Sequence, residues 1–373
     1  MYLNAQITFL LLPNLLLIGA FLVVSGIQLY YYWHYFYPLS FKKSPPILNY
    51  EKGVSVVIAA KNESRNIENC INKLLGQEYR NFEIIVVNDY SDDDTLERLQ
   101  KIASNKLLVL NNAGDRGKKS ALNQGIKAAK HEFLLFIDAD CVPASEHWIS
   151  NMVKHFSPKQ EVVLGFGAFR KENGLLNKII RLDGFITALQ YFGFANSGKA
   201  YMGVGRNLAY RKLTFEAIGG FEQHKGILSG DDDLLVNQVA TSTNVSIELD
   251  ECAHTLTDGE NKWSAYFNQK RRQLSAGTQY KKLDKIRLAI FGASSFLFYF
   301  LFVTLLIFSP FKLAIFGIFA VKQLLELVLL RVIAKRLKVD DLLPFIVILE
   351  PIYMIYITAI GISTWFWKVE QWK

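Results

Sequence analysis

The chain carries long, nearly uncharged apolar runs toward its two ends and shorter, regularly spaced apolar segments between them. A helix needs about 20 mainly apolar residues to cross a bilayer. Runs that suit such helices occupy residues 7–32, 288–309, 313–330 and 342–367. The third contains Lys322 and Glu326, which lie four residues apart on one helix face and can neutralise each other away from lipid. The pattern predicts one N-terminal span within residues 1–40 and about three C-terminal spans within residues 288–367.

The middle of the chain, residues 50–280, has the alternating pattern of a folded domain. Short apolar runs predict strands at residues 54–60, 82–87, 107–110 and 133–137. Amphipathic patterns predict helices between them, one of them capped by the segment Asn62-Glu63-Ser64. Strands that alternate with helices indicate an α/β domain with a mostly parallel, Rossmann-like sheet covered on both faces. Transmembrane helices would then flank this domain at both ends.

Basic residues gather beside the apolar runs and set the predicted orientation. The formal net charge is +8, and the positive-inside rule places the clustered lysines and arginines in the cytoplasm. We therefore expect a multi-pass protein of the inner (cytoplasmic) membrane with its α/β domain in the cytoplasm. Contact with anionic membrane lipids explains the excess charge more simply than nucleic acid does, so we expect no nucleic-acid partner. The clusters are Lys42, Lys43, Lys281, Lys282, Lys285, Arg287, Arg331, Lys335, Arg336 and Lys338.

Two further features narrow the class of protein. The first apolar run lacks a preceding basic region and a following small-x-small site, so an uncleaved anchor is favoured over a signal peptide. The three cysteines have no paired spacing, which predicts neither disulfides nor a zinc site and suits a reducing compartment.

The most informative polar motif follows the strand at residues 133–137. That strand ends in Asp138-Ala139-Asp140, and ligands in open α/β sheets bind at the carboxyl ends of strands. Hard cations such as Mg²⁺ or Mn²⁺ prefer carboxylate and phosphate oxygens. An isolated Asp-x-Asp is more often a solvated turn. The motif gains weight only from what surrounds it.

A second acidic cluster, residues 231–233, precedes an apolar pattern with helical spacing. Aspartates are favoured at a helix N-terminus for electrostatic reasons alone. Crowded carboxylates also repel one another, which can raise the pKa of one of them and make it a better base. Other apparent motifs are incomplete. The segment 114–120 has too few residues between its glycines for a Walker loop, and the acidic run 89–94 lacks the glycine of a calcium loop.

Taken in order, the motifs of the middle domain resemble those of the large family-2 inverting glycosyltransferases. The resemblance covers roughly residues 50–280. It implies a GT-A fold that binds a nucleotide sugar, and a divalent metal, Mg²⁺ or Mn²⁺. It rests on VSVVIAAKNE (54–63), FEIIVVNDYSDDDT (82–95), GKKSALNQGI (117–126), FIDAD (136–140), GRNLAYRKLTFEAIGGF (205–221), SGDDDLL (229–235) and QKRRQ (269–273).

Carried over by position, the resemblance also implies a role for each motif residue. On the donor side, Asp138 would face the ribose or donor sugar, and Asp140, with Asp138, would hold the metal. Asp232 would be the catalytic base, flanked by Asp231 and Asp233. The residues implied to bind the nucleotide and its phosphates are Ala60, Asn62, Glu63, Asp89 and Lys118. Those implied to lie on the acceptor side are Asn207, Gln269 and Arg272.

Two departures from the family pattern keep several functions open. The acidic motif begins with Asp231 where the family usually has Glu, and Gln273 stands where processive synthases carry Trp. The main hypothesis is an enzyme that moves a sugar from a UDP- or GDP-linked donor to a hydroxyl of a lipid-linked or membrane-proximal glycan acceptor. The alternatives are a processive polysaccharide synthase and an inactive nucleotide-sugar sensor. The basic segment 269–273 also suits an amphipathic helix on the headgroups, and residues 174–196 suit a second one.

Overall fold

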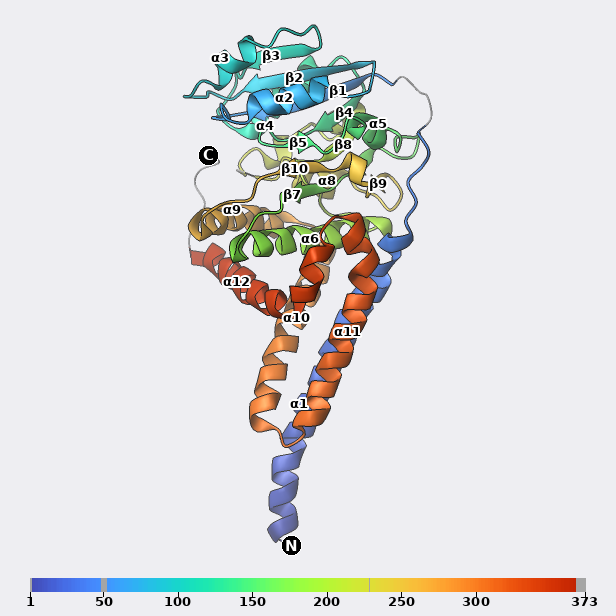
Figure 1. Ribbon diagram of the computed structural model, residues 1–373, viewed down its shortest axis with the longest axis vertical. Coiled ribbons are helices and arrows are strands. Elements are labelled where there is room, and N and C mark those ends of the chain that lie inside the picture. The colour runs from blue at the N-terminus through green and yellow to red at the C-terminus, as the bar shows by residue number, and fades with distance from the viewer. Residues whose placement is uncertain (1, 48–51, 228, 367–373) are drawn as a thin grey trace.

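The computed structural model describes residues 2–47, 52–227 and 229–366. An α/β domain forms one end of the molecule, and a bundle of long helices projects from the other (Figure 1). Between them lies a layer formed by α6 (Leu175–Asn196) and α9 (Trp263–Ala276). We call α6 and α9 the two-helix layer.

The first half of the α/β domain is a parallel sheet, as its apolar pattern predicts. Adjacent parallel strands β3, β2, β1 and β4 take up one side of a seven-stranded sheet with the order β3-β2-β1-β4-β8-β6-β9. Their bounds are β1 Val54–Ala60, β2 Phe82–Asn88, β3 Leu107–Asn111 and β4 Phe133–Phe136. The four strands predicted from the sequence are therefore confirmed to within a residue at each end.

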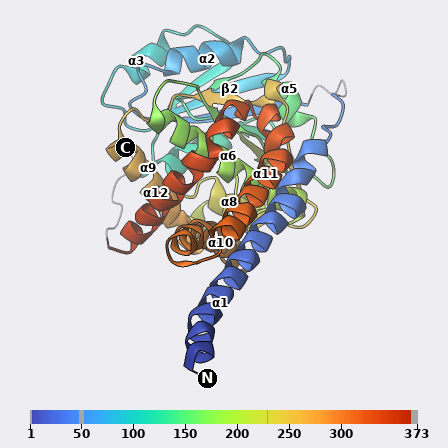
Figure 2. The ribbon, with the colours of Figure 1, turned by 60° about the horizontal axis from the view of Figure 1, so that its bottom comes forward.

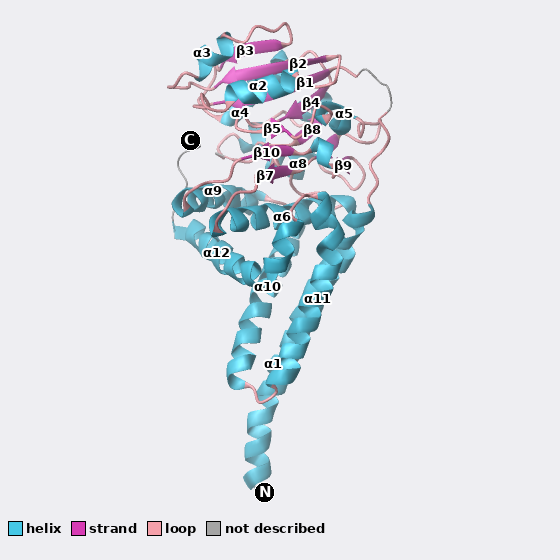
Figure 3. Cartoon of the chain, viewed as in Figure 1, coloured by secondary structure: helices cyan, strands magenta, loops and turns pink. Residues whose placement is uncertain are grey.

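The second half of the sheet departs from parallel order. Strand β8 (Leu208–Arg211) pairs antiparallel with both β4 and β6 (Val162–Leu164), and β9 (Val245–Ile247) closes the edge. A small second sheet lies between this one and the two-helix layer (Figure 3). It contains β5 (Val142–Pro143), β10 (Thr255–Thr257) and β7 (Gly167–Phe169).

Both faces of the main sheet are buried, because successive side chains of a strand point to opposite faces. In β1, Val56 and Ile58 pack into one apolar cluster, while Val57 and Ala59 pack into another. Helices α2 (Ile67–Leu75), α3 (Thr95–Gln100) and α5 (Trp148–Val153) cover the first face. Helices α4 (Lys118–Ala128), α8 (Asp233–Val239) and α7 (Lys212–Ala217) contribute to the second cluster, together with α6.

The predicted cap of the first helix is wrong. Helix α2 begins at Ile67 with Asn66 at its N-cap, and no side chain caps it. The segment Asn62-Glu63-Ser64 is instead hydrogen-bonded to the loop after β2. The Asn62 backbone amide donates to Ser91 Oγ (3.1 Å), that of Glu63 to Thr95 Oγ1 (2.8 Å) and that of Ser64 to Asp93 Oδ2 (3.1 Å).

Helix α6 was expected on the membrane surface, and the structure corrects this. Most of its side chains are buried, because it lies between the α/β domain and the long helices (Figure 1). Its aromatic and aliphatic side chains belong to the same cluster as β1, α4 and α12. It is therefore part of the core.

In the part of the chain that the structure describes, four helices are long and apolar enough to cross a membrane, as the sequence predicts, which indicates a membrane protein. Helices α1, α10 and α11 form the projecting bundle (Figure 1). The fourth, α12, instead lies obliquely under the two-helix layer (Figure 2). Trp367, the expected end of the last run, lies outside the described residues. The bounds are α1 Tyr2–Tyr31, α10 Lys282–Phe308, α11 Lys312–Arg336 and α12 Ile346–Phe366.

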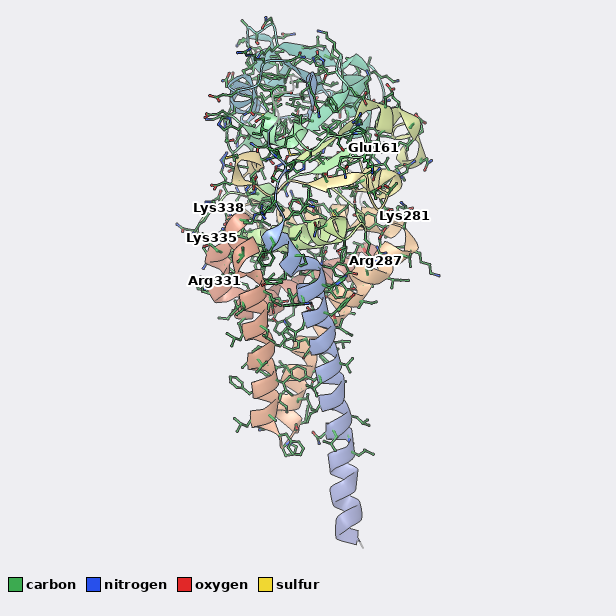
Figure 4. The ribbon with its side chains drawn as sticks, turned by 90° about the vertical axis from the view of Figure 1, so that its right-hand side faces the viewer. Glu161, Lys281, Arg287, Arg331, Lys335 and Lys338 are labelled. Carbon is green, nitrogen blue, oxygen red and sulfur yellow. The ribbon has the colours of Figure 1, made fainter. Side chains whose placement is uncertain are left out.

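Short π- and 3₁₀-turns join these elements. They are η1 (Tyr32–Phe36) and η2 (Tyr37–Phe41) after α1, η3 (Glu222–His224), η4 (Glu251–Ala253), η5 (Gly277–Gln279) and η6 (Asp340–Phe345). Basic residues from separate helices gather where the bundle meets the α/β domain. Figure 4 shows Lys281, Arg287, Arg331, Lys335 and Lys338 at this end. This is the arrangement that the positive-inside rule associates with the cytoplasmic face.

Candidate active site

A cleft of about 1150 Å³ runs from the carboxyl ends of β1 and β4, through the two-helix layer, to the apolar helices α10 and α12. Its position agrees with the rule that open α/β sheets bind ligands beyond the carboxyl ends of their strands. We call the part next to β1 and β4 the donor end. The part lined by α6, α9, α10 and α12 is the acceptor end.

Asp138 and Asp140 lie together at the donor end. The potential ligand atoms of Asp138, Asp140 and Cys141 all fall within 4.8 Å of one another. Cys141 is buried, and burial together with the two carboxylates raises the pKa of its thiol well above the usual value. The thiol contacts Asp140 Oδ1 at 3.3 Å as a donor. The oxygens of the two carboxylates are therefore the chemically suitable ligands here, and they suit a hard cation such as Mg²⁺ or Mn²⁺.

Lys118 connects the two acidic motifs. Its Nζ lies 2.8 Å from Asp138 Oδ1 and 2.8 Å from Asp231 Oδ2. Burial alone would lower the pKa of Lys118, but the surrounding carboxylates raise it well above its ordinary value. The side chain is therefore a fixed positive charge in the cleft. It begins helix α4, directly after Gly117, whose φ of 136° favours glycine.

The acidity of Asp232 is strongly altered by its surroundings. Burial raises its pKa to about 8, with the charges of Asp231 and Asp233 adding to the effect. Lys118 and the backbone amide of Gly205 act in the opposite direction. That amide donates to Asp232 Oδ2 at 2.6 Å, and the amide of Asp233 donates to Oδ1 at 2.7 Å. Asp232 is thus an oriented carboxyl group that gains or loses its proton near neutral pH.

The side chains of Asp231 and Asp233, on either side of Asp232, are fixed by contacts with other residues. Asp231 pairs with Lys118, while Asp233 accepts hydrogen bonds from Tyr280 Oη (2.6 Å) and the backbone amide of Leu234 (2.8 Å). Burial raises the pKa of Asp233 as well, while the hydrogen bond from Tyr280 lowers it. The helix start that the sequence predicts is confirmed, because Asp232 is the N-cap of α8.

Gly205 lies against this acidic cluster with little room for a side chain. A Cβ at this position would lie 3.2 Å from Lys118 Nζ and 3.3 Å from Asp232 Oδ2. Glycine therefore allows the backbone amide to approach the carboxylate of Asp232 closely.

Three residues expected in the nucleotide pocket do not line the cleft. Ala60 is buried at the end of β1, and Asn62 accepts a hydrogen bond from the Asp92 amide through Oδ1 (2.8 Å). Asp89 is fully buried; its carboxylate accepts hydrogen bonds from Asn112 Nδ2 (2.7 Å) and the Gly117 amide (3.0 and 3.1 Å). Since Gly117 precedes Lys118, Asp89 holds the loop that presents that lysine. Glu63, Lys118, Asp138 and Asp140 do line the cleft.

Asn207 was expected near the acceptor, and the structure corrects this placement. The side chain is fully buried. Its amide donates to the carbonyls of Phe166 (3.0 Å) and Ala253 (2.7 Å), and its oxygen accepts from Trp148 Nε1 (3.0 Å). These bonds connect Asn207 to α5 and to the segments just before β7 and β10, so Asn207 is structural. Gln269 and Arg272, by contrast, both line the cleft from α9.

Sequence reasoning missed several residues that line the cleft, most of them at the acceptor end. Asp183 of α6 forms an ion pair with Lys270 of α9 (2.8 Å) and accepts a hydrogen bond from Tyr353 Oη of α12 (2.9 Å). Arg206 stacks over the ring of Phe169, with 4.2 Å from its guanidinium carbon to the ring centroid. Arg206 and Lys270 sit inside recognised motifs and were detectable by their charge. Asp183 and Tyr353 gave no signal, because their partners are remote in sequence.

Comparison with known proteins agrees with the resemblance that the motifs indicate. Residues 55–219 match the profile of the family described as Glycosyl transferase family 2. This segment lies within residues 50–280, over which the motifs resemble family-2 glycosyltransferases, and its match agrees with that resemblance.

Two curated relatives match part of the chain. The poly-beta-1,6-N-acetyl-D-glucosamine synthases of Staphylococcus aureus (strain COL) and Staphylococcus epidermidis are each 34% identical to this chain, over 161 and 136 residues. The matches cover 42% and 35% of this chain, and the chain spans only 39% and 32% of the length of these curated relatives.

A solved structure resembles almost the whole chain. It is the mannosyltransferase PcManGT from Pyrobaculum calidifontis, in complex with GDP-Man and Mn²⁺. The match covers 95% of this chain and 98% of that chain, with a TM-score of 0.57 and 19% identity. This likeness confirms the predicted GT-A-like α/β fold flanked by apolar helices.

Proposed function

We propose that this protein is a membrane-bound inverting glycosyltransferase that moves a sugar from a nucleotide-sugar donor to an acceptor hydroxyl. The observation that carries the proposal is the position of Asp232. It is an oriented carboxyl group of raised pKa, in the same cleft as the Asp138–Asp140 pair and Lys118. A protein that only bound nucleotide sugars would have no use for such a base, which argues against the sensor hypothesis.

The donor end suits a UDP- or GDP-linked sugar. Displacement of the nucleoside diphosphate leaves negative charge on the departing phosphates. A Mg²⁺ or Mn²⁺ ion held by Asp140, with Asp138, would stabilise that charge without proton transfer. Lys118 adds a compact positive charge beside the same carboxylates. Glu63 and the loop after β1 would border the nucleotide.

The acceptor hydroxyl needs a base, because a neutral hydroxyl is a weak nucleophile. Asp232 accepts its proton as the bond to the sugar carbon forms. Burial, together with the charges of Asp231 and Asp233, keeps the pKa of Asp232 high, so that the proton acceptor is strong enough for the task. A single attack from the face opposite the diphosphate inverts the anomeric centre.

We propose a lipid-linked or membrane-proximal glycan as the acceptor. The cleft continues past Asp232 to Leu288 and Phe291 of α10 and to Ile357 of α12, all apolar. Gln269 and Arg272 line the path between these two regions. An acceptor with a polar head and an apolar anchor fits this gradient. The basic residues at the domain end of the bundle support a cytoplasmic placement of the α/β domain, in contact with membrane lipids.

A processive polysaccharide synthase is the second candidate. The names of the curated relatives favour it. The missing tryptophan at Gln273 favours single addition instead. The length of the product formed with excess donor separates the two candidates.

The test compares Asp232→Asn with Asp233→Asn. Loss of general-base catalysis typically costs about 10²–10⁴ in rate, so Asp232→Asn should lower transfer by that factor. Donor affinity should stay unchanged, because the base acts on the acceptor in the transition state. Asp233→Asn keeps a side chain that accepts the Tyr280 hydrogen bond and should cost much less.

Purified protein would first be offered a panel of nucleotide sugars with Mg²⁺ or Mn²⁺. Turnover and donor affinity would then be measured on each variant. Near-full turnover in Asp232→Asn would contradict the proposed base. If Asp233→Asn is inactive while Asp232→Asn is active, the base is Asp233 and not Asp232.

A further inference from the structure

The last apolar helix, α12, and the turn before it contact the two-helix layer at positions from residue 341 to residue 356. Before the helix, Asp341 forms an ion pair with Arg181 of α6 (2.6 Å), and the ring of Phe345 lies 4.1 Å from Lys178 Nζ. Further along, Tyr353 Oη donates to Asp183, and Tyr356 Oη donates to the carbonyl of Trp263 in α9 (3.3 Å).

These contacts are incompatible with a helix that runs away from the two-helix layer and crosses the bilayer. A helix rises about 1.5 Å per residue, so residue 356 would lie roughly 22 Å beyond residue 341 along such a span. Both residues instead contact the layer that borders the α/β domain. Figures 1 and 3 agree, since α12 ends beside α9 while α1, α10 and α11 continue to the far end.

The exposure pattern of α12 shows which way it faces. Ile348, Ile355 and Ile362 are 64%, 66% and 49% exposed and recur every seven residues, so they form one apolar stripe. Leu349, Met354 and Ile360 on the other side are buried. The exposed stripe is therefore the side of α12 that would face lipid, and the buried residues are the side that packs on the protein.

The polar groups near the start of α12 are satisfied inside the protein. Glu350 is buried and accepts a hydrogen bond from Tyr299 Oη of α10 (2.6 Å). Gln323 of α11 donates to the same hydroxyl (3.2 Å), and the neighbouring Lys322 pairs with Glu326. Intramembrane charges are normally paired and face away from lipid. This network attaches one end of α12 to the bundle, as Asp341 attaches the segment to α6.

We propose that residues 340–366 are not a fourth span. They form an in-plane segment on the catalytic side of the membrane, and the inner face of this segment is the acceptor-side wall of the cleft. Tyr353, Met354 and Ile357 line the cleft opposite Phe291 and Gly292 of α10. The apolar part of the acceptor passes between these two helices. The claim about the wall rests on the proposed function, whereas the claim about the membrane does not.

The membrane claim is tested by cysteine labelling in intact cells with an impermeant maleimide. The background is the full chain with Cys252→Ser, since Cys70 and Cys141 are buried. One variant adds a cysteine after Lys373, and a control carries Lys312→Cys at the start of α11, next to the turn from α10. We expect the control to label in intact cells and the C-terminal cysteine to label only after permeabilisation. If both cysteines are labelled in intact cells, α12 crosses the membrane as a fourth span, and the proposal is overturned.

The wall claim is tested by a matched pair of substitutions on α12. Ile357→Trp fills the cleft, whereas Ile355→Trp places the same side chain on the exposed stripe. The assay follows radiolabel from the nucleotide sugar into vesicles made from the total lipid of the expressing cells. We expect Ile357→Trp to lower transfer at least about tenfold with donor affinity unchanged, which also shows that the variant is folded, and Ile355→Trp to match the parent.

Equal transfer by the two variants would overturn the wall claim. A parent protein that turns over no nucleotide sugar would refute the proposed function and, with it, the wall claim. The labelling result would still decide the membrane claim.

Discussion

The donor end and the acceptor end of the cleft are built in different ways. At the donor end, Lys118 begins α4, and Asp138 and Asp140 follow the end of β4 within four residues, so local sequence positions them. At the acceptor end, the side chains come from α6, α9, α10 and α12, which are far apart in the chain. Buried polar contacts between these helices fix their arrangement, as in the pairing of Lys270 with Asp183.

This difference predicts different responses to substitution. Changes at the donor end should alter the binding of metal and nucleotide while the fold persists, because its carboxylates are partly exposed at strand ends. Changes to the buried pairs at the acceptor end should destabilise the protein, since they leave an uncompensated charge in the interior.

The largest expected effect follows from Lys270→Met. The side chains of Lys270 and Asp183 are 8% and 6% exposed, and removing one partner of a buried pair typically costs about 3–5 kcal/mol. Thermal unfolding in detergent should show a marked loss of stability. The double variant Lys270→Met/Asp183→Asn should recover part of it, because no buried charge is left unpaired. A single variant as stable as the parent would show that the pair does not hold the layer together.

A smaller effect, confined to binding, is expected for Asp140→Asn at the donor end. Loss of a carboxylate ligand should weaken metal-dependent donor binding by more than about tenfold, with little change in unfolding temperature. Calorimetry with and without EDTA measures this directly. Unchanged affinity in both conditions would remove Asp140 from the metal site.

The smallest predicted change concerns pH and sharpens the role of Asp232 at the junction of the two ends. A base must be unprotonated, and burial raises the pKa of Asp232 to about 8. The value of kcat/KM should therefore rise with pH, about tenfold per unit below pH 8, and level off above it. Asp233→Asn removes a neighbouring negative charge and should move the midpoint to lower pH. A profile that falls through this range would contradict the assignment.

The fold was largely predictable because its signals are local. The apolar runs at 54–60 and 133–137 match β1 and β4 closely, since strands buried on both faces read as continuous apolar segments. The cap at Asn62 was not predictable. Its side chain and backbone bond instead to a loop some thirty residues further along the chain.

The site was predictable only in part, because only some of its residues are positioned by local sequence. Asp138, Asp140 and Asp232 stand at strand or helix ends and line the cleft as expected. Asp89 and Asn207 have equally distinctive surroundings in sequence. Their hydrogen-bonding capacity is taken up by backbone and side-chain partners that only the folded chain brings close. Helix α12 likewise has the composition of a span, and its contacts with α6 and α9 place it elsewhere.

The stereochemistry of the product tests the central claim most directly. With a donor of known α-configuration, identified from the nucleotide-sugar panel, proton NMR of the first product reports the configuration at the anomeric carbon. Direct displacement assisted by Asp232 predicts a β-linked product and no glycosyl-enzyme intermediate. An α-linked product would mean retention of configuration, and would contradict a single displacement in which Asp232 acts as the base.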